Sequence, residues 1–480
     1  MLHFAIKDAH LPVRTVQVVT IRTLAPSQQK PCCHGVCAST LRRKPASVHI
    51  PSVASTTVSL AEGIATLSGM ILLSSTVAVT LWTVLYARVF RQPTDAPLAN
   101  ELLPRAAVLM GLKGTDPYLR DGLRRLMTQD YPDYEVRIVI DSRDDPAWPL
   151  VEAAIRDTNA KHVSVIKYQE SPEHGIVNCT NSKVVQALRG LDDSFEAIAM
   201  ADGDVVANEN WLRELISPLA RDPKIGVTTG NRWFIPPSMS SGNLVRHLWN
   251  VATTSIMYHL RMPWGGCYGI RMSAIRDGGL IDKWAKVAAL DMHTTGEMKS
   301  LGLKVHFVPS LMMVNREESP LPAATNWIRR QLTWARLYNP GWWFVVVHTS
   351  VAALAMAVAI VATTVGVFFE FTYPVVWAAS GFTSYLFGMT ALVALLEGCI
   401  RQRLRASGQI IEPFQLRTLL PVLLAVPLTQ FVQLVATLQA TFVKRVAWRG
   451  SILEVNGPND IRVIDAPSTE EGTNRTARAA

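Results

Sequence analysis

The chain has 480 residues, of which 49% are hydrophobic and 18% charged, with a positive mean hydropathy of +0.18 and a net charge of +9. This composition is too apolar for an average soluble enzyme, and the length is sufficient for a catalytic domain with accessory segments. The positive charge flanks apolar runs instead of alternating with aromatic residues, which argues against nucleic-acid binding.

Residues 1–60 are poor in acids and rich in Ser, Thr and basic residues. Such a segment is typical of a targeting sequence or of a disordered tail. It contains Cys32, Cys33, His34 and Cys37, which could form half of a metal site. Free thiols are the simpler interpretation, because the second half of such a site is missing.

Four runs without Asp, Glu, Lys or Arg each exceed the roughly 20 apolar residues that cross a bilayer. They are Gly63–Tyr86, Leu337–Phe369, Phe371–Leu396 and Thr418–Val443. The sequence therefore predicts an integral, multi-pass membrane protein. Its N-terminal transmembrane helix lies within 61–90, and its C-terminal transmembrane or membrane-associated helices lie within 341–446.

Basic residues follow the first, third and fourth runs, as in cytosolic loops. A cytosolic domain followed by three spans would nevertheless place "KRVAWRG", which begins at Lys444, on the outside. Pro421 and Pro427 could resolve this conflict with the positive-inside rule, because they allow the last segment to be a broken or re-entrant helix.

Strand-like and helix-like segments alternate in the soluble region, residues 105–340. The predicted strands are Ala106–Met110, Glu135–Ile140, His162–Lys167 and Ala197–Met200, and the predicted helices are Asp121–Met127, Leu150–Asn159 and Asn181–Leu191. Such alternation predicts an α/β fold with a mostly parallel sheet. Ligands bind beyond the carboxyl ends of these strands, so Asp141 and Asp202, each at a strand end, are expected at the rim of a site.

Three acids suggest specific chemistry. Asp202 and Asp204, two residues apart, could hold a divalent cation that neutralises a departing diphosphate, although a solvated Asp-Gly-Asp turn is the alternative. Asp291 begins a predicted helix, where it is either a simple cap or a general base that takes a proton from an acceptor hydroxyl.

Two further segments complete the candidate site. Gly265 and Gly266, followed by Cys267, predict a loop whose backbone can approach the acceptor closely. "NWIRRQLTWARLYNP" predicts a basic amphipathic helix that lies on lipid headgroups, reaches a diphosphate, or does both.

Together these features resemble the membrane-bound glycosyltransferases of family 2, and among them the ceramide glucosyltransferases, over residues 105–340. "LKGTDPYL" resembles the family's first-strand loop, "DSRDDPA" its first acidic motif, "NSKV" its Asn-Pro-Lys segment and "RQLTW" its Gln/Arg-x-x-Arg-Trp motif. Asp202 and Asp291 match its second and third aspartates.

The resemblance implies a GT-A type domain, with a mixed, mostly parallel sheet between helices, that faces the cytosol. It implies inverting transfer of a hexose, with glucose favoured, from a UDP-sugar to a lipid hydroxyl such as that of ceramide, with Mn²⁺ or Mg²⁺ as cofactor. The site residues that it implies are Lys113, Gly114, Asp141, Asn181, Lys183 and Asp202 for the nucleotide sugar, Asp202 and Asp204 for the metal, and Asp291, Arg330 and Trp334 for catalysis.

The sequence departs from the family pattern at Ser182, Leu290 and Thr333, where Pro, an acid and Arg are usual. The last change removes a cation expected near the diphosphate. Arg329 and Arg336 are the candidates to replace it, and we expect Arg336 to compensate. A processive polysaccharide synthase is an alternative, opposed by Thr333 and by the small number of spans. A catalytically dead scaffold is another, opposed by the retained acids.

The polar end of the chain, residues 450–480, is predicted to be disordered.

Overall fold

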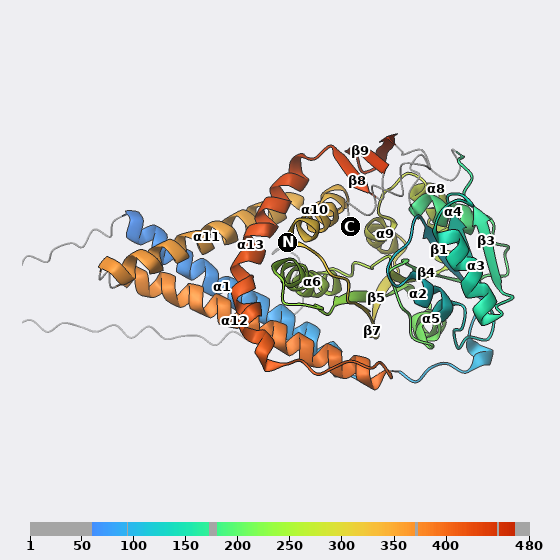
Figure 1. The fold of residues 1–480 in the computed structure, drawn as a ribbon, viewed down its shortest axis with the longest axis horizontal. Helices are drawn as coiled ribbons and strands as arrows, with labels where there is room; N and C mark the ends of the chain where they lie inside the picture. The colour runs from blue at the N-terminus through green and yellow to red at the C-terminus, as the bar shows by residue number, and fades with distance from the viewer. Residues whose placement is uncertain (1–59, 94, 172–179, 370–372, 449–450, 466–480) are drawn as a thin grey trace, which may run out of the picture. The chain divides into compact units, whose positions relative to one another are not determined.

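The computed structural model describes residues 60–93, 95–171, 180–369, 373–448 and 451–465 (Figure 1). The predicted tail up to residue 59, with its cysteine cluster, lies outside the described residues, and so does the segment 466–480.

A seven-stranded sheet forms the centre of the soluble domain, in the order β3-β2-β1-β4-β6-β5-β7. In the sheet, β6 runs antiparallel to β4 and β5, and the other neighbouring pairs are parallel. The strands are β1 Ala106–Leu112, β2 Tyr134–Ile140, β3 Val163–Lys167, β4 Ala197–Ala201, β5 Ile225–Phe234, β6 Cys267–Arg271 and β7 Lys304–Asn315. The predicted fold class, a mixed, mostly parallel sheet between helices, is confirmed.

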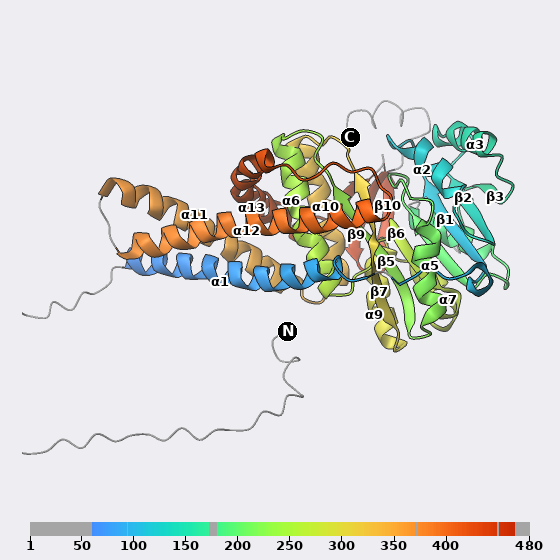
Figure 2. The same cartoon turned by 90° about the horizontal axis from the view of Figure 1, so that it is seen from below.

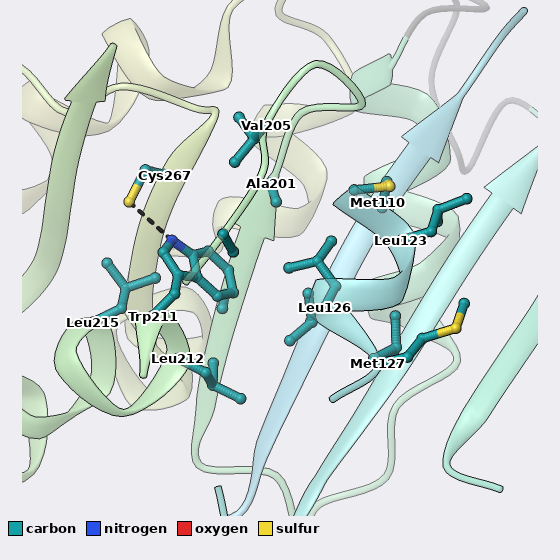
Figure 3. Packing of buried hydrophobic residues seen from close by; sticks show 14 of the residues in the cluster. Met110, Leu123, Leu126, Met127, Ala201, Val205, Trp211, Leu212, Leu215 and Cys267 are labelled. Atoms are coloured by element: carbon teal, nitrogen blue, oxygen red, sulfur yellow. Dashed lines mark hydrogen bonds between the residues drawn. The ribbon is translucent and has the colours of Figure 1, made fainter. Parts of the chain in front are cut away.

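Helices cover both faces of this sheet. One buried cluster packs β1, β2 and β4 against α2 Leu119–Leu126, α3 Ala147–Thr158 and α5 Trp211–Arg221 (Figure 3). The other packs the opposite face against α4 Thr180–Arg189, α7 Met272–Asp277, α8 Leu280–Trp284 and α9 Leu290–Ser300. Because the strands are buried on both faces, they are apolar along most of their length, as parallel strands usually are.

Cys267 lies inside the first of these clusters and not in a loop. It is the first residue of β6, its side chain is fully buried, and its Sγ accepts a hydrogen bond of 3.1 Å from Trp211 Nε1 (Figure 3). Burial raises the pKa of the thiol to about 12. The prediction that Cys267 belongs to the acceptor loop is therefore wrong, because its side chain packs in the core of the domain.

Among the described residues, four helices are long and apolar enough to cross a membrane. They are α1 Leu60–Val89, α11 Trp342–Phe369, α12 Tyr373–Ala406 and α13 Leu419–Phe442, the last preceded by the short helix η2 Leu416–Thr418. α1 lies along α12 (Figures 1 and 2). Their backbones approach so closely that a Cβ atom on Gly381 would lie 2.3 Å from the Gly69 carbonyl oxygen. Small residues permit such packing between membrane helices.

α13 has a different placement. It crosses the direction of α11 and α12 and packs against α6 Ser241–His259 and α10 Leu321–Tyr338 of the soluble domain (Figure 1). The helix is continuous with Pro427 inside it, so the break expected at its prolines is not seen. At its end, the Thr441 carbonyl accepts a hydrogen bond of 2.7 Å from Arg336 of α10.

The chain after α13 is folded as far as Asp465, which corrects the prediction of a disordered tail from residue 450. A three-stranded antiparallel sheet contains β8 Arg445–Trp448, β9 Ser451–Gly457 and β10 Asp460–Asp465. Val446, Leu453, Val455 and Ile461 are buried against Trp334 of α10. This apolar burial stabilises the sheet.

Candidate active site

The ends of β1 and β2 hold a carboxylate between two lysines. The pairing of Leu112 with Ile140 brings Lys113 beside Asp141. Lys183 Nζ, from α4, lies 2.5 Å from one Asp141 oxygen, and Lys113 Nζ lies 3.7 Å from the other. Lys183 is 1% exposed. A buried lysine requires a charge partner, so this ion pair fixes Asp141 at the rim of the sheet.

The loop after β1 is anchored by an acid that the sequence analysis did not single out. Gly114 has a positive φ of 69°, and its N–H donates to both carboxylate oxygens of Asp145 at 3.1 Å. Asp145 also accepts from the backbone N–H of Ala147 at 2.8 Å. The role of Gly114 is thus conformational, because other residues rarely adopt this φ.

Asn181, predicted to bind the nucleotide sugar, connects two segments of the site through a hydrogen bond. Its side-chain amide donates a 2.9 Å hydrogen bond to the carbonyl of Val287, just before α9. The residue is 8% exposed. This contact ties α4, which carries Lys183, to the segment that leads to Asp291.

Asp202 and Asp204 follow β4, as predicted, and both face one arginine of β5. Nη2 of Arg232 lies 3.4 Å from Asp202 Oδ2 and 3.3 Å from Asp204 Oδ2. Asn315 Nδ2, at the end of β7, donates to Asp204 Oδ2 at 3.3 Å. The two carboxylates therefore converge on one point that a cation already occupies.

These residues fit a divalent cation only in part. Both oxygens lie within 3.5 Å of a single nitrogen, so the two carboxylates share one cation position, and hard oxygen ligands suit Mg²⁺ or Mn²⁺. Across the residues that the structure describes, no group of three His, Cys, Asp or Glu side chains could hold a metal. Two carboxylates leave the other coordination positions to substrate phosphates and water, as Mg²⁺ sites usually do.

Asp291 lies at the start of α9 with both oxygens bound by the backbone. Its Oδ2 accepts from the N–H of Gly265 at 2.9 Å, and its Oδ1 from the N–H of Met292 at 2.8 Å. Burial raises the pKa of this carboxyl above its ordinary value, although these hydrogen bonds and the nearby Arg232 oppose the shift. A fixed carboxylate with a raised pKa is suited to take a proton.

Close neighbouring atoms explain why positions 265 and 266 of the predicted acceptor loop are glycines. A Cβ on Gly265 would lie 3.3 Å from Asp291 Oδ2, and one on Gly266 would lie 2.1 Å from the Trp264 ring. The pairing of Ala201 with Cys267 puts Gly266 opposite Asp202 across the β4–β6 ladder. The loop thus brings the surroundings of Asp202 and Asp291 together.

The residues of the last motif, on α10, are placed differently from one another. Thr333 is fully buried, and its hydroxyl donates to the carbonyl of Arg329 at 2.9 Å. Trp334 packs on the C-terminal sheet, and Arg336 donates to the Thr441 carbonyl. Arg330 is partly exposed. In this structure the guanidinium of Arg336 caps the end of α13, and its role as a replacement for the missing cation stays a prediction.

The sequence analysis missed Arg232, and one signal could have found it. "GVTTGNRWF" is a buried strand with a single charge, and a charge in such a strand usually has a functional partner. It also missed Ser451, whose hydroxyl accepts a 3.0 Å hydrogen bond from Lys113 Nζ. Nothing in the local sequence links Lys113 with Ser451, because the two residues are 338 positions apart.

The sequence matches glycosyl transferase family 21 over residues 67–461. The chain belongs to this family. The match includes α12, α13, β8 and β9 as well as the catalytic domain, and it ends within β10.

Curated relatives agree with this membership. A ceramide glucosyltransferase of Gibberella zeae is 26% identical over 122 residues, which cover 24% of this chain and 22% of that protein. A ceramide glucosyltransferase of Pyricularia oryzae is 30% identical over 79 residues, 16% of each chain. The resemblance to ceramide glucosyltransferases is confirmed, with the family numbered 21 instead of 2. The matched part is about a fifth of the relatives' length.

Solved structures with a similar chain path are more distant. A mannosyltransferase of Pyrobaculum calidifontis, in complex with GDP-Man and Mn²⁺, is 16% identical with a TM-score of 0.44, over 80% of this chain and 99% of that one. A glucosyl-3-phosphoglycerate synthase of Mycobacterium tuberculosis, with Mn²⁺, UDP and glucosyl-3-phosphoglycerate, is 12% identical with a TM-score of 0.35, over 52% and 88% of the two chains.

Proposed function

We propose that this family 21 glycosyltransferase transfers a hexose, with glucose favoured, from a UDP-sugar to the hydroxyl of a membrane lipid such as ceramide. The observation that supports this proposal best is that the acids of the site have two kinds of surroundings. Asp141, Asp202 and Asp204 are paired with cations, whereas Asp291 is held by backbone N–H groups and has a raised pKa.

The binding acids define the donor end of the site. Asp141, fixed by Lys113 and Lys183, would hold the uridine, and the carboxyl ends of β1, β2 and β4 would receive the nucleotide. Asp202 and Asp204 would hold Mn²⁺ or Mg²⁺ beside the diphosphate. When bound, such an ion neutralises negative charge that develops on the departing diphosphate.

Asp291 would act as the general base. It takes the proton of the lipid hydroxyl while the hydroxyl oxygen attacks the anomeric carbon from the face opposite UDP. The bond between that carbon and the diphosphate oxygen breaks, UDP leaves, and the configuration at the anomeric carbon inverts. The contacts from Gly265 and Met292 keep the carboxylate in one orientation, which is how proximity lowers the barrier.

The contact between α13 and the soluble domain gives a reason for the lipid acceptor. α6, α10 and α13 pack together directly beside the catalytic sheet, so an acceptor that stays in the bilayer could reach Asp291 without leaving it. The ceramide glucosyltransferases among the relatives support ceramide as the first acceptor to test.

We further propose three crossings, by α1, α11 and α12, with α13 lying on the cytosolic face. Support comes from both ends of α13: Arg401 of α12 donates to the Glu412 carbonyl before it, and Arg336 donates to the Thr441 carbonyl at its end. With α13 on the surface, the basic residues after α1, α12 and α13 all share the side of the catalytic domain. That arrangement obeys the positive-inside rule, which four crossings would violate.

Protease protection on sealed, oriented vesicles tests this topology. A site engineered into the exposed turn at residue 408 and another after residue 465 should both be cut from the cytosolic side. Cleavage of the two sites from opposite sides would show that α13 crosses the bilayer.

Donor choice tests the proposed function itself. Purified protein in lipid nanodiscs should release UDP from UDP-glucose in the presence of a lipid acceptor and should spare GDP-mannose. Release of a nucleotide only from GDP-mannose would exclude a UDP-sugar donor.

A further inference from the structure

Arg232 occupies the centre of the site, and the proposed function leaves it without a role. Its side chain is 13% exposed and lies against two carboxylates, Asp202 and Asp204, through the same nitrogen. Its guanidinium carbon also lies 4.7 Å from the centre of the Trp264 ring, in a cation–π contact. The residue is therefore held by charge on one side and by an aromatic face on the other.

Among the described residues, the last motif has Thr333 at the position where the glycosyltransferases that this chain resembles carry Arg. Thr333 is neutral and hydrogen-bonded within its own helix, and Arg336 is bonded to the end of α13. A departing diphosphate still needs charge-assisted hydrogen bonds, which are stronger than neutral ones. Arg232 is a described cation that already lies among the acids of the site.

We propose that Arg232 is an exchangeable cation of this site. In the donor-free enzyme it neutralises Asp202 and Asp204; when a divalent cation and the donor bind, it gives up these carboxylates and its charge serves the departing diphosphate. The second half rests on the proposed function, whereas the first concerns metal binding alone.

The exchange follows from the atoms involved. Arg232 contacts Oδ2 of both aspartates, so a metal ion that binds these two oxygens takes the same ligands and repels the guanidinium. The Trp264 face can keep the guanidinium nearby while its nitrogens change partners, because a cation–π contact has no fixed hydrogen-bond direction.

The backbone of Arg232 is meanwhile held in place. Its neighbour Trp233 is fully buried and donates a 3.0 Å hydrogen bond from Nε1 to Glu397 of α12. The change of partner is thus confined to the side chain of Arg232.

Replacing the charge by an amide, Arg232→Gln, should change two properties in opposite directions. Affinity for Mn²⁺ alone, measured on the purified full chain by the electron paramagnetic resonance signal of free Mn²⁺, should rise about tenfold, the size expected for a direct competing contact. Turnover of the UDP-sugar with saturating Mn²⁺ should fall about a hundredfold, as for the loss of one donor to a developing charge.

Two further variants serve as controls. Arg232→Lys keeps the charge without the planar fork, so it should retain the weak Mn²⁺ affinity of the wild type and recover part of the turnover. Arg276→Gln removes the same charge from an exposed pair with Asp193, and both properties should remain those of the wild type. Because metal binding rises in Arg232→Gln, general misfolding cannot imitate the expected result.

Each half of the proposal can be overturned separately. Unchanged or weaker Mn²⁺ binding by Arg232→Gln would refute the exchange. Tighter Mn²⁺ binding with full turnover would refute the role at the diphosphate. If the wild type turned over no UDP-sugar while Arg232→Gln still bound Mn²⁺ more tightly, the proposed function would fail and the exchange would stand.

Discussion

Asp291 differs from the other acids of the site in how its charge is compensated. Lysines or an arginine accompany Asp141, Asp202 and Asp204, whereas backbone N–H groups and a buried setting surround Asp291. Environments of these two kinds separate acids that bind a ligand from an acid that moves a proton.

Replacing Asp291 by Asn should therefore separate binding from chemistry. We expect Asp291→Asn to bind UDP like the wild type and to lose about a thousandfold in turnover, within the range for a missing general base. Asp141→Asn is the matched variant and should weaken UDP binding instead. Calorimetry with UDP and turnover of both variants check this, and near-normal turnover of Asp291→Asn would exclude it as the base.

The raised pKa of Asp291 predicts a pH dependence. A base works only when deprotonated, so turnover should fall as the pH falls through this raised pKa, which lies above the ordinary aspartate value of about 3.9. A turnover profile that stays flat down to pH 4 in protein that remains folded would contradict the assignment.

Thr333 has a packing role that its sequence position conceals. Its side chain is fully buried, with 0% of its surface accessible to solvent. We expect Thr333→Arg to lower the free energy of unfolding by about 3 kcal/mol through overpacking and a buried charge. The variant should not turn over any sugar donor faster than the wild type does. Thr333→Val keeps the shape of the side chain but removes the hydroxyl that donates to the Arg329 carbonyl, so it should cost only about 1 kcal/mol. Thermal unfolding in detergent measures both, and a stable, more active Thr333→Arg enzyme would refute this account.

At the scale of elements, the C-terminal sheet contacts the loop after β1, beside the proposed donor site. Ser451 contacts Lys113, and the carbonyl of Pro458 accepts a 2.9 Å hydrogen bond from Tyr338 of α10. The sheet also covers Trp334. These contacts connect the end of the chain to the first-strand loop and to the last motif.

Truncation tests whether the sheet supports the site. A chain that ends at residue 450 should bind UDP about tenfold more weakly, because Lys113 loses a partner and Trp334 loses its apolar cover. A chain that ends at residue 465 keeps the sheet and should bind like the full chain. Equal UDP affinity of both truncated chains would show that the sheet does not support the donor site.

The sequence predicted those elements whose signals are local. The strands that end at Asp141 and Asp202 and the helix that begins near Asp291 follow from apolar runs that end at acids. The hairpin of β9 and β10 also had a signal, because apolar residues alternate on both sides of "NGPND". Arg232, Ser451 and the burial of Trp334 depend on contacts between distant segments, which periodicity does not encode.

At the scale of the whole molecule, a buried polar network fastens the catalytic sheet to the membrane helices. Glu397 of α12 is 1% exposed, accepts from Trp233 of β5, pairs with Arg401, and lies 3.4 Å from His247 of α6. Buried charges persist when they are paired and hydrogen-bonded. The network holds the strand that carries Arg232 at a fixed place relative to α12, so the site and the membrane segments form one working unit.

The identity of the product tests the central claim most directly. Membranes that contain the wild-type chain, supplied with a UDP-hexose and ceramide, are extracted and the lipids analysed by mass spectrometry, with Asp291→Asn membranes as the control. The account predicts a lipid heavier than the acceptor by one hexose in the wild type and its near absence in the variant. A polymeric product, or a monohexosyl lipid formed equally well by Asp291→Asn membranes, would contradict it.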